Sequence, residues 1–281
     1  MAKLPYDKRK AITIIIPVLN QLAYTKKCLA SLSDDLVAGV KVVVVDNGSD
    51  DGTVEFLAAR DNLSVIRNEE NLGCAAAWNQ GVMAATAAEW IAVLNNDVLV
   101  ADDWLRALLD FAEKQNIDIV SPAMREGELN YDLEGYARSF VSAMKDMQRP
   151  GTAHGACFVV RRRVFETIGL FDENFRIGQF EDTDFFLRAR RAGFRLAITG
   201  AAFIHHFGSV TQDSITRSRS VRPYEVENRA YFREKWRMGW WRRRKQRLIS
   251  AARTARWRQR ELRQGGHSLN EKWIGGRLVY Y

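Results

Sequence analysis

Two clusters of oxygen-bearing side chains follow apolar segments within the first hundred residues. The segment ending at Val45 runs into Asp46-Asn47-Gly48-Ser49, and the segment ending at Leu94 runs into Asn95-Asn96-Asp97. A carboxylate beside an amide can hold a base edge and ribose hydroxyls, and glycine allows the backbone to approach a ligand closely. Oxygen ligands with few carboxylates suit Mg²⁺ or Mn²⁺ shared with substrate phosphates. Each segment taken alone is also typical of an ordinary turn.

A third candidate is the start of the helix predicted after Asn71-Leu72-Gly73, which continues through Asn79 and Gly81. Free amides at a helix N-terminus favour a phosphate group. Asn71 acting as a helix cap explains the same residues without a ligand. The pattern is therefore compatible with a phosphate site or with a structural cap.

Apolar, β-branched segments alternate with segments of helical period through the first 120 residues. Strands that are apolar on both faces and separated by helices indicate a parallel sheet covered on both sides, which is the α/β class. Such sheets bind ligands at the carboxyl ends of their strands, so we expect the polar clusters at one edge. The predicted strands are 12–16, 40–45, 63–67, 90–94 and 117–121, and the predicted helices are 22–32, 53–59, 75–85 and 103–113.

The sequence changes character at residue 122. Residues 122–153 interrupt the alternation of strands and helices with Gly, Asn, Asp and Arg and show weak periodicity, so we expect a variable loop or lid there. Strand 156–160, helices 163–168 and 180–192, strand 195–199 and the pair His205-His206 follow. We therefore divide the chain into a first half (1–121), a second half (122–220) and a C-terminal extension (221–281).

Charge is unevenly distributed over the 281 residues. The chain carries a net charge of +8, but residues 229–263 hold 14 Lys and Arg against two acidic residues, net +12, and the first 228 residues carry −5. A hydrophobic content of 47% excludes a disordered chain, and three widely spaced Cys indicate neither a disulfide framework nor a thiolate zinc site. No segment reaches the roughly 20 apolar residues of a membrane-spanning helix. We expect a cytosolic protein or one that rests on a membrane surface.

Considered together, these segments resemble the inverting glycosyltransferases of family 2. The resemblance rests on motif order and spacing over residues 11–211, and it is strongest for the rhamnosyltransferase-type enzymes of bacterial surface-polysaccharide assembly. It implies a GT-A fold over residues 1–220, with a Rossmann-like, mainly parallel central sheet flanked by helices, followed by a basic helical extension. The segments that carry it are 14–20, 45–49, 71–73, 79–81, 94–97, 155–157, 169–173, 181–184 and 205–206.

The resemblance implies a nucleotide-sugar donor site in the first half of the chain. Asp46 and Asn47 would hold the base and ribose, while Pro17 and Leu19 would line the base pocket. Asp97 ends a segment that stands where the family has its DxD motif, so it would bind a Mn²⁺ or Mg²⁺ ion that bridges the diphosphate, although the first Asn departs from that motif. The other implied donor-site residues are Asn71, Gly73, Asn79, Asn95 and Asn96.

The resemblance also implies catalytic groups in the second half. Asp182 matches the general base that takes the proton of the acceptor hydroxyl, and Glu181 would tune it. Asp184 would orient the acceptor, or form a structural ion pair with Arg188 four residues later on the same helix.

Three further residues complete the implied site. His205 or His206 would supply another metal ligand or a diphosphate contact; adjacent strand residues point to opposite faces, so we expect only one to face the site and favour His206. His154 and Gly155 fall where the acceptor pocket is expected, with a structural histidine as the alternative for His154.

Tryptophan and arginine alternate in the C-terminal extension. Helical spacing places Trp240, Trp241 and Leu248 on one face, which Arg244 and Arg258 interrupt. Basic residues with interfacial aromatics favour an anionic membrane surface over 229–263. The helix could instead pack its tryptophans against the catalytic body or a second subunit in a homo-oligomer. Nucleic acid is a third and less favoured partner, because no nucleic-acid-binding fold accompanies the segment.

The sequence thus predicts a metal-dependent inverting glycosyltransferase. It would move a sugar such as rhamnose from a dTDP-, UDP- or GDP-linked donor to a glycan or lipid-linked acceptor in surface-polysaccharide synthesis, in the cytoplasm or peripherally on the inner face of the plasma membrane. Two alternatives stay open. One is a nucleotidyltransferase of similar fold, and the other is a non-catalytic nucleic-acid-binding or scaffold-binding protein that acts through its basic extension.

Overall fold

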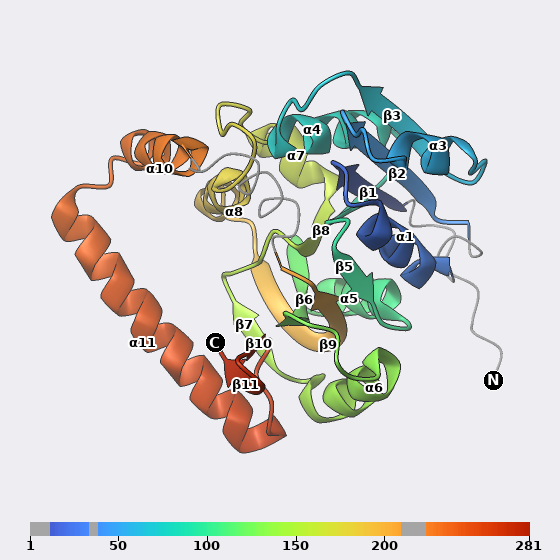
Figure 1. Ribbon diagram of the computed structural model, residues 1–281. Coiled ribbons are helices and arrows are strands. Elements are labelled where there is room, and N and C mark those ends of the chain that lie inside the picture. Colours follow the sequence, from blue (N-terminus) through green and yellow to red (C-terminus); the bar gives the residue numbers. More distant parts are fainter. Residues whose placement is uncertain (1–11, 34–38, 209–222) are drawn as a thin grey trace.

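One sheet runs through the centre of the structure (Figure 1). The structure is a computed structural model, and it describes residues 12–33, 39–208 and 223–281. Within these ranges the sheet has 11 strands. Its main path is β11-β10-β6-β8-β4-β1-β2-β3, and β9 pairs with β6 and with the short strands β5 and β7. The α/β class with helices flanking the sheet is confirmed.

The first half of the chain forms the parallel part of the sheet. β1 (Ile12–Val18) lies between β2 (Lys41–Asn47) and β4 (Trp90–Leu94), and β3 (Ser64–Asn68) pairs with β2. β1, β2 and β4 are almost continuously buried, as expected for strands covered on both faces. The helices between and after them are α1 (Leu22–Ser31), α3 (Thr53–Ala58), α4 (Cys74–Ala84) and α5 (Trp104–Lys114).

The side chains of β1 show how helices cover both faces of the sheet. Ile14 and Ile16 pack in one core cluster with residues of α1 and α5, whereas Ile15 packs in another cluster with α4. A Cβ atom at Gly81 of α4 would collide with Cγ2 of Ile15. Glycine therefore allows α4 to lie this close to the strand.

The second half of the chain adds an antiparallel insertion. β8 (Cys157–Arg161) lies antiparallel between β4 and β6 (Ile119–Glu126). The long strand β9 (Leu196–His206) runs parallel to β6 and antiparallel to β5 (Val98–Val100) and β7 (Gln148–Pro150). Two helices, α7 (Arg162–Ile168) and α8 (Glu181–Arg191), lie between β8 and β9 in the chain.

Residues 122–153 contain regular structure, so our expectation of a variable loop or lid is wrong. β6 continues to Glu126, and α6 spans Leu133–Met144 before β7. Asp132 caps α6, because its Oδ2 accepts a hydrogen bond from the Gly135 amide at 3.1 Å. The buried residues of α6 recur at three- and four-residue spacing, a helical pattern that the polar residues between them obscured: Ala137, Phe140 and Met144.

The C-terminal extension is partly built into the same sheet. The expected helices are present as α10 (Pro223–Lys235) and α11 (Trp240–Gly265), but β10 (Asn270–Ile274) and β11 (Arg277–Tyr280) follow, and β10 pairs in parallel with β6. Arg149 of β7 and Glu261 of α11 form a buried, bidentate ion pair with N–O distances of 2.8 and 2.7 Å. The boundary at residue 220 therefore stays a proposal, since segments on both sides of it share one sheet.

The helix α11 lies along the outside of the molecule (Figure 1). Its C-terminal end is anchored through the Glu261 ion pair. Several large apolar side chains in its N-terminal half are exposed, and Trp241 has an exposed fraction of 76%. Across the described ranges, no helix combines the length and the apolar character needed to cross a membrane. The exposed large apolar residues of α11 are Trp240, Trp241, Leu248 and Ile249.

Candidate active site

The loops that follow β1 and β2 are joined at the carboxyl edge of the sheet. The Asn20 amide donates to Oγ of Ser49 at 2.8 Å, and the Asp50 amide donates to Oδ1 of Asn20 at 2.8 Å. Asn20 and Gln21 have positive φ angles of 54° and 62°, a left-handed conformation that Asn adopts more readily than most residues. The two loops therefore behave as one unit.

Asp46 carries a buried oxygen without a partner. Its Oδ1 accepts a hydrogen bond from the Ser49 amide at 3.1 Å, but Oδ2 has no partner among the described residues. The β1–β2 register places Asp46 opposite Val18. The two residues that flank Val18 in the chain, Pro17 and Leu19, are half-buried. An unpaired buried carboxylate oxygen costs free energy unless a ligand donates to it. Asp46 is thus ready to accept an N–H or O–H from a ligand.

Asn47 uses its whole side-chain amide within the protein. Its Nδ2 donates to Oδ1 of Asn71 at 2.9 Å and to the Gly73 carbonyl at 3.2 Å, while its Oδ1 accepts from Asn68 and from the Leu72 amide. These bonds exhaust the two donors and two acceptor positions of the amide. The structure therefore brings Asn47, Asn71 and Gly73 together as the scaffold of the loop between β3 and α4.

The start of α4 and Asn79 contact the loop between α7 and α8. The Cys74 amide donates to the Ile177 carbonyl at 2.8 Å, so one N-terminal amide of α4 is already paired. Asn79 is buried, donates to the Phe171 carbonyl at 3.0 Å and accepts from the Phe171 amide at 2.9 Å. Asn79 thus fixes this loop and lies apart from the Asn47 and Asn71 pair.

Asp97 and His206 meet where β5 pairs with β9. Oδ1 of Asp97 lies 3.3 Å from Nε2 of His206, and Oε2 of Glu126 lies 3.9 Å from Nδ1 of the same ring. Burial alone would lower the pKa of His206, but the Asp97 and Glu126 carboxylates outweigh burial and raise it above its ordinary value. Charge as well as packing therefore holds this imidazole beside Asp97.

His205 points to the other face of β9. Its Nδ1 lies 3.0 Å from the Tyr131 hydroxyl, and its ring packs edge-on against Phe207. Burial lowers the pKa of His205 to about 4, so the ring is neutral at physiological pH. Of the two histidines, it is His206 that the structure brings to Asp97.

The two asparagines before Asp97 anchor the turn after β4. Asn96 is buried, and its Nδ2 donates to Oγ1 of Thr25 in α1 at 3.1 Å. The Asn95 amide donates to the Ala156 carbonyl at 3.0 Å, while the Asn95 side chain is half-buried. The turn is thus fixed on one side by α1 and on the other by the residue before β8.

A divalent metal fits Asp97 and His206 as a site that substrate completes. In the part of the chain that the structure describes, no three or more His, Cys, Asp or Glu side chains are grouped so as to hold a metal ion by themselves. A carboxylate oxygen with an imidazole nitrogen suits Mn²⁺, and cations that bind phosphates use few protein ligands and fill the remaining positions with phosphate oxygens and water. The residues present therefore fit a metal that is bound together with a diphosphate.

Glu181 and Asp182 begin α8 as an interacting pair of carboxyl groups. Burial, followed by the charge of Asp182, raises the pKa of Glu181 to about 8, and burial also raises the pKa of Asp182. Oδ1 of Asp182 accepts from the Thr183 amide at 2.6 Å. The pair therefore retains a proton near neutral pH, and the Asp182 carboxylate is more basic than an exposed one.

Gly155 lies against Asp182 and links it to the turn after β4. A Cβ atom at Gly155 would lie 2.5 Å from Oδ2 of Asp182, so glycine makes room for this carboxylate. The next residue, Ala156, accepts the hydrogen bond from Asn95. His154 is tied to β6 instead: its Nε2 lies 2.9 Å from the Pro122 carbonyl, and burial lowers its pKa to about 4.

Asp184 is fully engaged inside the protein. Its carboxylate bonds with Nε of Arg188 at 2.8 Å, which is the ion pair expected on this helix. Nζ of Lys235, the last residue of α10, and Nε1 of the next residue, Trp236, reach it at 2.8 and 2.9 Å. Asp184 therefore joins α8 to α10, which corresponds to the structural alternative for this residue.

Comparison with known proteins places these residues in a family. A family model described as Glycosyl transferase family 2 matches residues 13–169, more than half of the chain. The chain belongs to glycosyl transferase family 2. The match includes Asp46, Asp97 and Gly155, whereas Asp182 and His206 lie beyond it. Membership favours a glycosyltransferase over the nucleotidyltransferase and non-catalytic alternatives.

Curated relatives of this family 2 chain include named glycosyltransferases. It is 30% identical over 197 residues to glycosyltransferase AglE of Haloferax volcanii, covering 66% of this chain and 63% of that protein. It is 29% identical over 207 residues to the pre-mycofactocin glycosyltransferase of Mycobacterium tuberculosis, covering 69% and 42%. The N-acetylglucosaminyl-diphospho-decaprenol L-rhamnosyltransferase of M. tuberculosis is 27% identical over 237 residues, covering 69% and 77%. The chain thus spans less than two thirds of AglE and of the pre-mycofactocin enzyme, and its resemblance to a rhamnosyltransferase is distant.

Solved structures share the fold of this family 2 chain. The crystal structure of GalNAc-T7 with UDP, GalNAc and Mn²⁺ has a TM-score of 0.57 at 16% identity, over 72% of this chain and 44% of that one. The crystal structure of S. aureus TarS 1-349 in complex with UDP has a TM-score of 0.54 at 19% identity, over 69% and 59%. At these identities the likeness establishes the fold, and the predicted GT-A fold is confirmed.

A strained loop precedes Asp182, and α10 holds it. Ile177, Gln179 and Phe180 have positive φ angles of 62°, 77° and 75°, which non-glycine residues keep only when their surroundings enforce them. Asn228 of α10 is buried, its Nδ2 donates to three carbonyls of the loop, and its Oδ1 accepts from the Arg176 amide at 3.1 Å. The extension therefore shapes the entrance to α8.

Asn228 was not among the predicted site residues, although the sequence carries a signal for it. Asn228 stands four residues after Tyr224 and four before Phe232, and all three are buried on α10. A polar residue that interrupts an apolar helical stripe predicts a buried hydrogen-bonding partner. The many charged residues around these three positions made the buried face of α10 difficult to recognise from the sequence.

Proposed function

We propose that this chain is an inverting glycosyltransferase that moves a sugar from a nucleoside diphosphate to a hydroxyl of a glycan or lipid-linked acceptor. One set of contacts carries the proposal. Asp182 lies against Gly155, and the neighbouring Ala156 accepts a hydrogen bond from Asn95. Asn95 belongs to the same turn as Asp97. A carboxylate of raised pKa thus belongs to the same edge of the sheet as the candidate metal ligands. Family membership supports the same activity.

The donor would bind along the carboxyl ends of β1, β2 and β4. The unpaired Oδ2 of Asp46 would accept a hydrogen bond from the base or ribose, and Pro17 and Leu19 would flank it. The Asn47, Asn71 and Gly73 scaffold would shape the neighbouring wall, and Asn79 would fix the loop behind it. Asn95 and Asn96 would position the turn that faces the diphosphate.

Asp97 and His206 would hold a Mn²⁺ or Mg²⁺ ion. Such an ion neutralises charge on a leaving diphosphate. GalNAc-T7, which shares the fold, was crystallised with UDP and Mn²⁺. We place His205 outside the site because its ring faces Tyr131.

Asp182 would act as general base in a single displacement. Its carboxylate takes the proton of the acceptor hydroxyl as the hydroxyl oxygen bonds to the anomeric carbon. The bond from that carbon to the phosphate oxygen breaks, and the nucleoside diphosphate leaves with the electron pair. Attack from the opposite side inverts the anomeric configuration. Glu181 would tune Asp182 as its neighbour, and His154 and Gly155 would border the acceptor pocket.

We also propose that α11 rests on the cytoplasmic side of an anionic membrane. Trp240, Trp241, Leu248 and Ile249 are exposed on a helix rich in arginine, a combination that favours the interface between lipid head groups and acyl chains. This placement would bring the enzyme to a lipid-linked acceptor. Rhamnose is one candidate sugar, supported by the distant rhamnosyltransferase relative.

A ligand screen tests the proposed function. Thermal denaturation with UDP-, dTDP- and GDP-sugars, each with Mn²⁺ or Mg²⁺, should show a raised Tm for one donor class, since a ligand of the native state stabilises it. Incubation of that donor with candidate acceptors should release a nucleoside diphosphate. Release of pyrophosphate from a nucleoside triphosphate, with no transfer from any sugar donor, would replace this proposal with a nucleotidyltransferase.

A further inference from the structure

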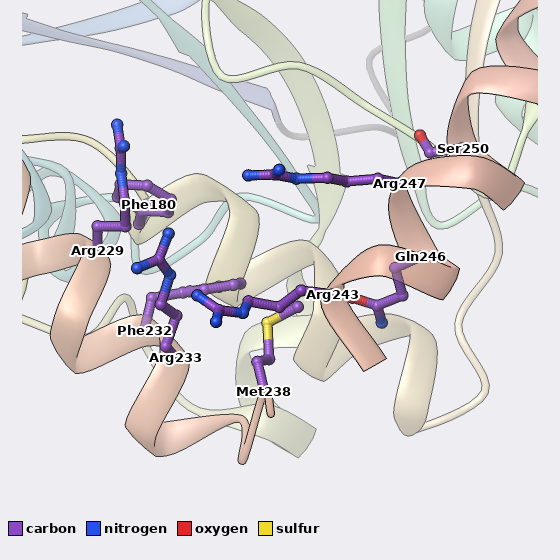
Figure 2. A pocket seen from close by; sticks show the side chains of 9 residues that line it. All are labelled: Phe180, Arg229, Phe232, Arg233, Met238, Arg243, Gln246, Arg247 and Ser250. Atoms are coloured by element: carbon purple, nitrogen blue, oxygen red, sulfur yellow. The ribbon is translucent and has the colours of Figure 1, made fainter. Parts of the chain in front are cut away.

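Four arginines surround a pocket at the junction of α8, α10 and α11. The pocket has a volume of about 380 Å³ and an aromatic side formed by Phe180 and Phe232. Figure 2 shows Arg243 and Arg247 reaching from α11 toward the side chains of α10. The arginines that line it are Arg229, Arg233, Arg243 and Arg247.

These guanidinium groups have no carboxylate partner within the described residues. Elsewhere in the fold, two arginines of lower exposure do have carboxylate partners: Arg149 pairs with Glu261, and Arg188 pairs with Asp184. No ion pair of that kind joins the four pocket arginines to any acidic residue of the described ranges. Desolvation and then the charges of the other three arginines lower the pKa of Arg233. The pocket therefore concentrates positive charge that no acidic residue of the described ranges neutralises by an ion pair.

Uncompensated guanidinium groups around a concave surface favour a polyvalent anion. Arginine presents several donors in a planar fork that matches phosphate oxygens. The aromatic wall and the exposed Trp240 and Trp241, which precede Arg243 on α11, add apolar surface beside the charge. A phosphate or diphosphate attached to a hydrocarbon chain matches both the positive charge of the arginines and the apolar surface beside them.

The pocket also adjoins the proposed catalytic base. Phe180 lines the pocket and is the N-cap of α8, while Asp182 is the second residue of that helix. Two residues span at most about 7 Å, so the pocket wall and Asp182 are neighbours. A phosphate bound among the arginines would hold the rest of a ligand close to Asp182.

We infer that this pocket binds the phosphate groups of a lipid-linked phosphate or diphosphate. Under the proposed function, on which this role rests, that ligand is the acceptor. The pocket fixes its phosphate end, the hydrocarbon lies along the apolar surface of α11, and the hydroxyl end reaches Asp182. The arginines bind and position the ligand and take no part in proton transfer.

Binding of farnesyl diphosphate to the full chain tests the site. The variant Arg233→Gln/Arg243→Gln removes two pocket charges, and Arg256→Gln/Arg263→Gln removes two exposed charges from α11 outside the pocket. Isothermal titration should show that the first variant weakens binding at least about tenfold, while the second stays within about twofold. Replacing the same two pocket arginines by lysine should restore part of the affinity. Equal affinity in both glutamine variants would overturn the proposal.

Further probes distinguish the source of the phosphate. Inorganic pyrophosphate should bind more weakly than farnesyl diphosphate but depend on the same arginines, and farnesol should not bind. If phosphatidylglycerol vesicles bind through Arg233 and Arg243 but farnesyl diphosphate does not bind, the pocket is a bilayer contact and the proposal fails. If no sugar donor supports transfer but farnesyl diphosphate still requires these arginines, the proposed function fails and the binding site stands.

Discussion

Nε2 of His206 lies 3.3 Å from Oδ1 of Asp97, and one short strand pairing sets this distance. Val98, the residue after Asp97, is in register with His206 in the antiparallel pair β5–β9. β9 is in turn held by β6 along its length. The positions of the two candidate metal ligands thus depend on sheet pairing, which is more rigid than a loop.

Removal of the Asp97 carboxylate should weaken metal-dependent donor binding. Asp97→Ala is expected to raise the Kd of the preferred nucleoside diphosphate in Mn²⁺ by about tenfold or more, because a carboxylate ligand is lost. Calorimetric titration with and without Mn²⁺ measures this effect. Asp102→Ala, an exposed aspartate in the same segment, should bind like the wild type. A metal response in Asp97→Ala as large as in the wild type would contradict the assignment.

Replacement of Asp182 by its amide should stop chemistry and spare binding. Asp182→Asn is expected to lower kcat by about a hundredfold to ten-thousandfold, the usual contribution of a general base. Its Kd for the donor should stay within about twofold of the wild type. Glu166→Gln, the same type of change on the exposed surface of α7, should retain full kcat. Wild-type turnover by Asp182→Asn would rule out this base.

Glu181 should make stability depend on pH. Its pKa is raised from the ordinary 4.5 to about 8 by burial and then by Asp182, so the folded state holds the proton more tightly than the unfolded state. This stabilisation is complete below about pH 4.5 and is lost as pH rises through about 8. In Glu181→Gln, thermal denaturation above pH 8 should give a Tm higher than the wild type by about 2 °C or more. Parallel Tm curves for the two proteins between pH 5 and 9 would show that Glu181 does not titrate in this way.

Asn228 should act on turnover as a positioning residue. Asn228→Ala removes the hydrogen bonds that hold loop 176–179, so kcat should fall about tenfold or more while the donor Kd changes little. Measurements well below the Tm of the variant separate this effect from unfolding. Glu227→Ala, the exposed neighbour on α10, provides the matched control. A fall in Tm with unchanged kcat would limit Asn228 to a structural role.

The parallel half of the fold was predictable from sequence because its signals are local. Predicted strand 90–94 coincides with β4, and predicted helix 53–59 ends one residue beyond α3. A short apolar segment that is buried on both faces indicates a strand and also indicates where the strand begins and ends. By contrast, the three-residue strands β5 and β7 depend on pairing with β9, a distant partner that no local pattern reveals.

The sequence predicted which residues belong to the candidate site better than it predicted the contacts that these residues make. Strand alternation predicted that only one of His205 and His206 faces the site, but it did not indicate which one. Asn47 could not be recognised as saturated by internal hydrogen bonds, because its partners lie more than twenty residues further along the chain, at residues 68–73. Asn228 lies outside the motifs that carried the resemblance, in a helix whose charge concealed its buried face.

The pairing of β10 with β6 has a consequence for synthesis on the ribosome. Residues 124–126 of β6 have one edge that, within the described ranges, only residues 270–272 cover, and these emerge after more than a hundred further residues have been translated. Until then the nascent chain presents unpaired backbone amides and carbonyls at that edge, which favours association with other chains. Chaperone dependence of the newly made protein should therefore be set by the delay between β6 and β10.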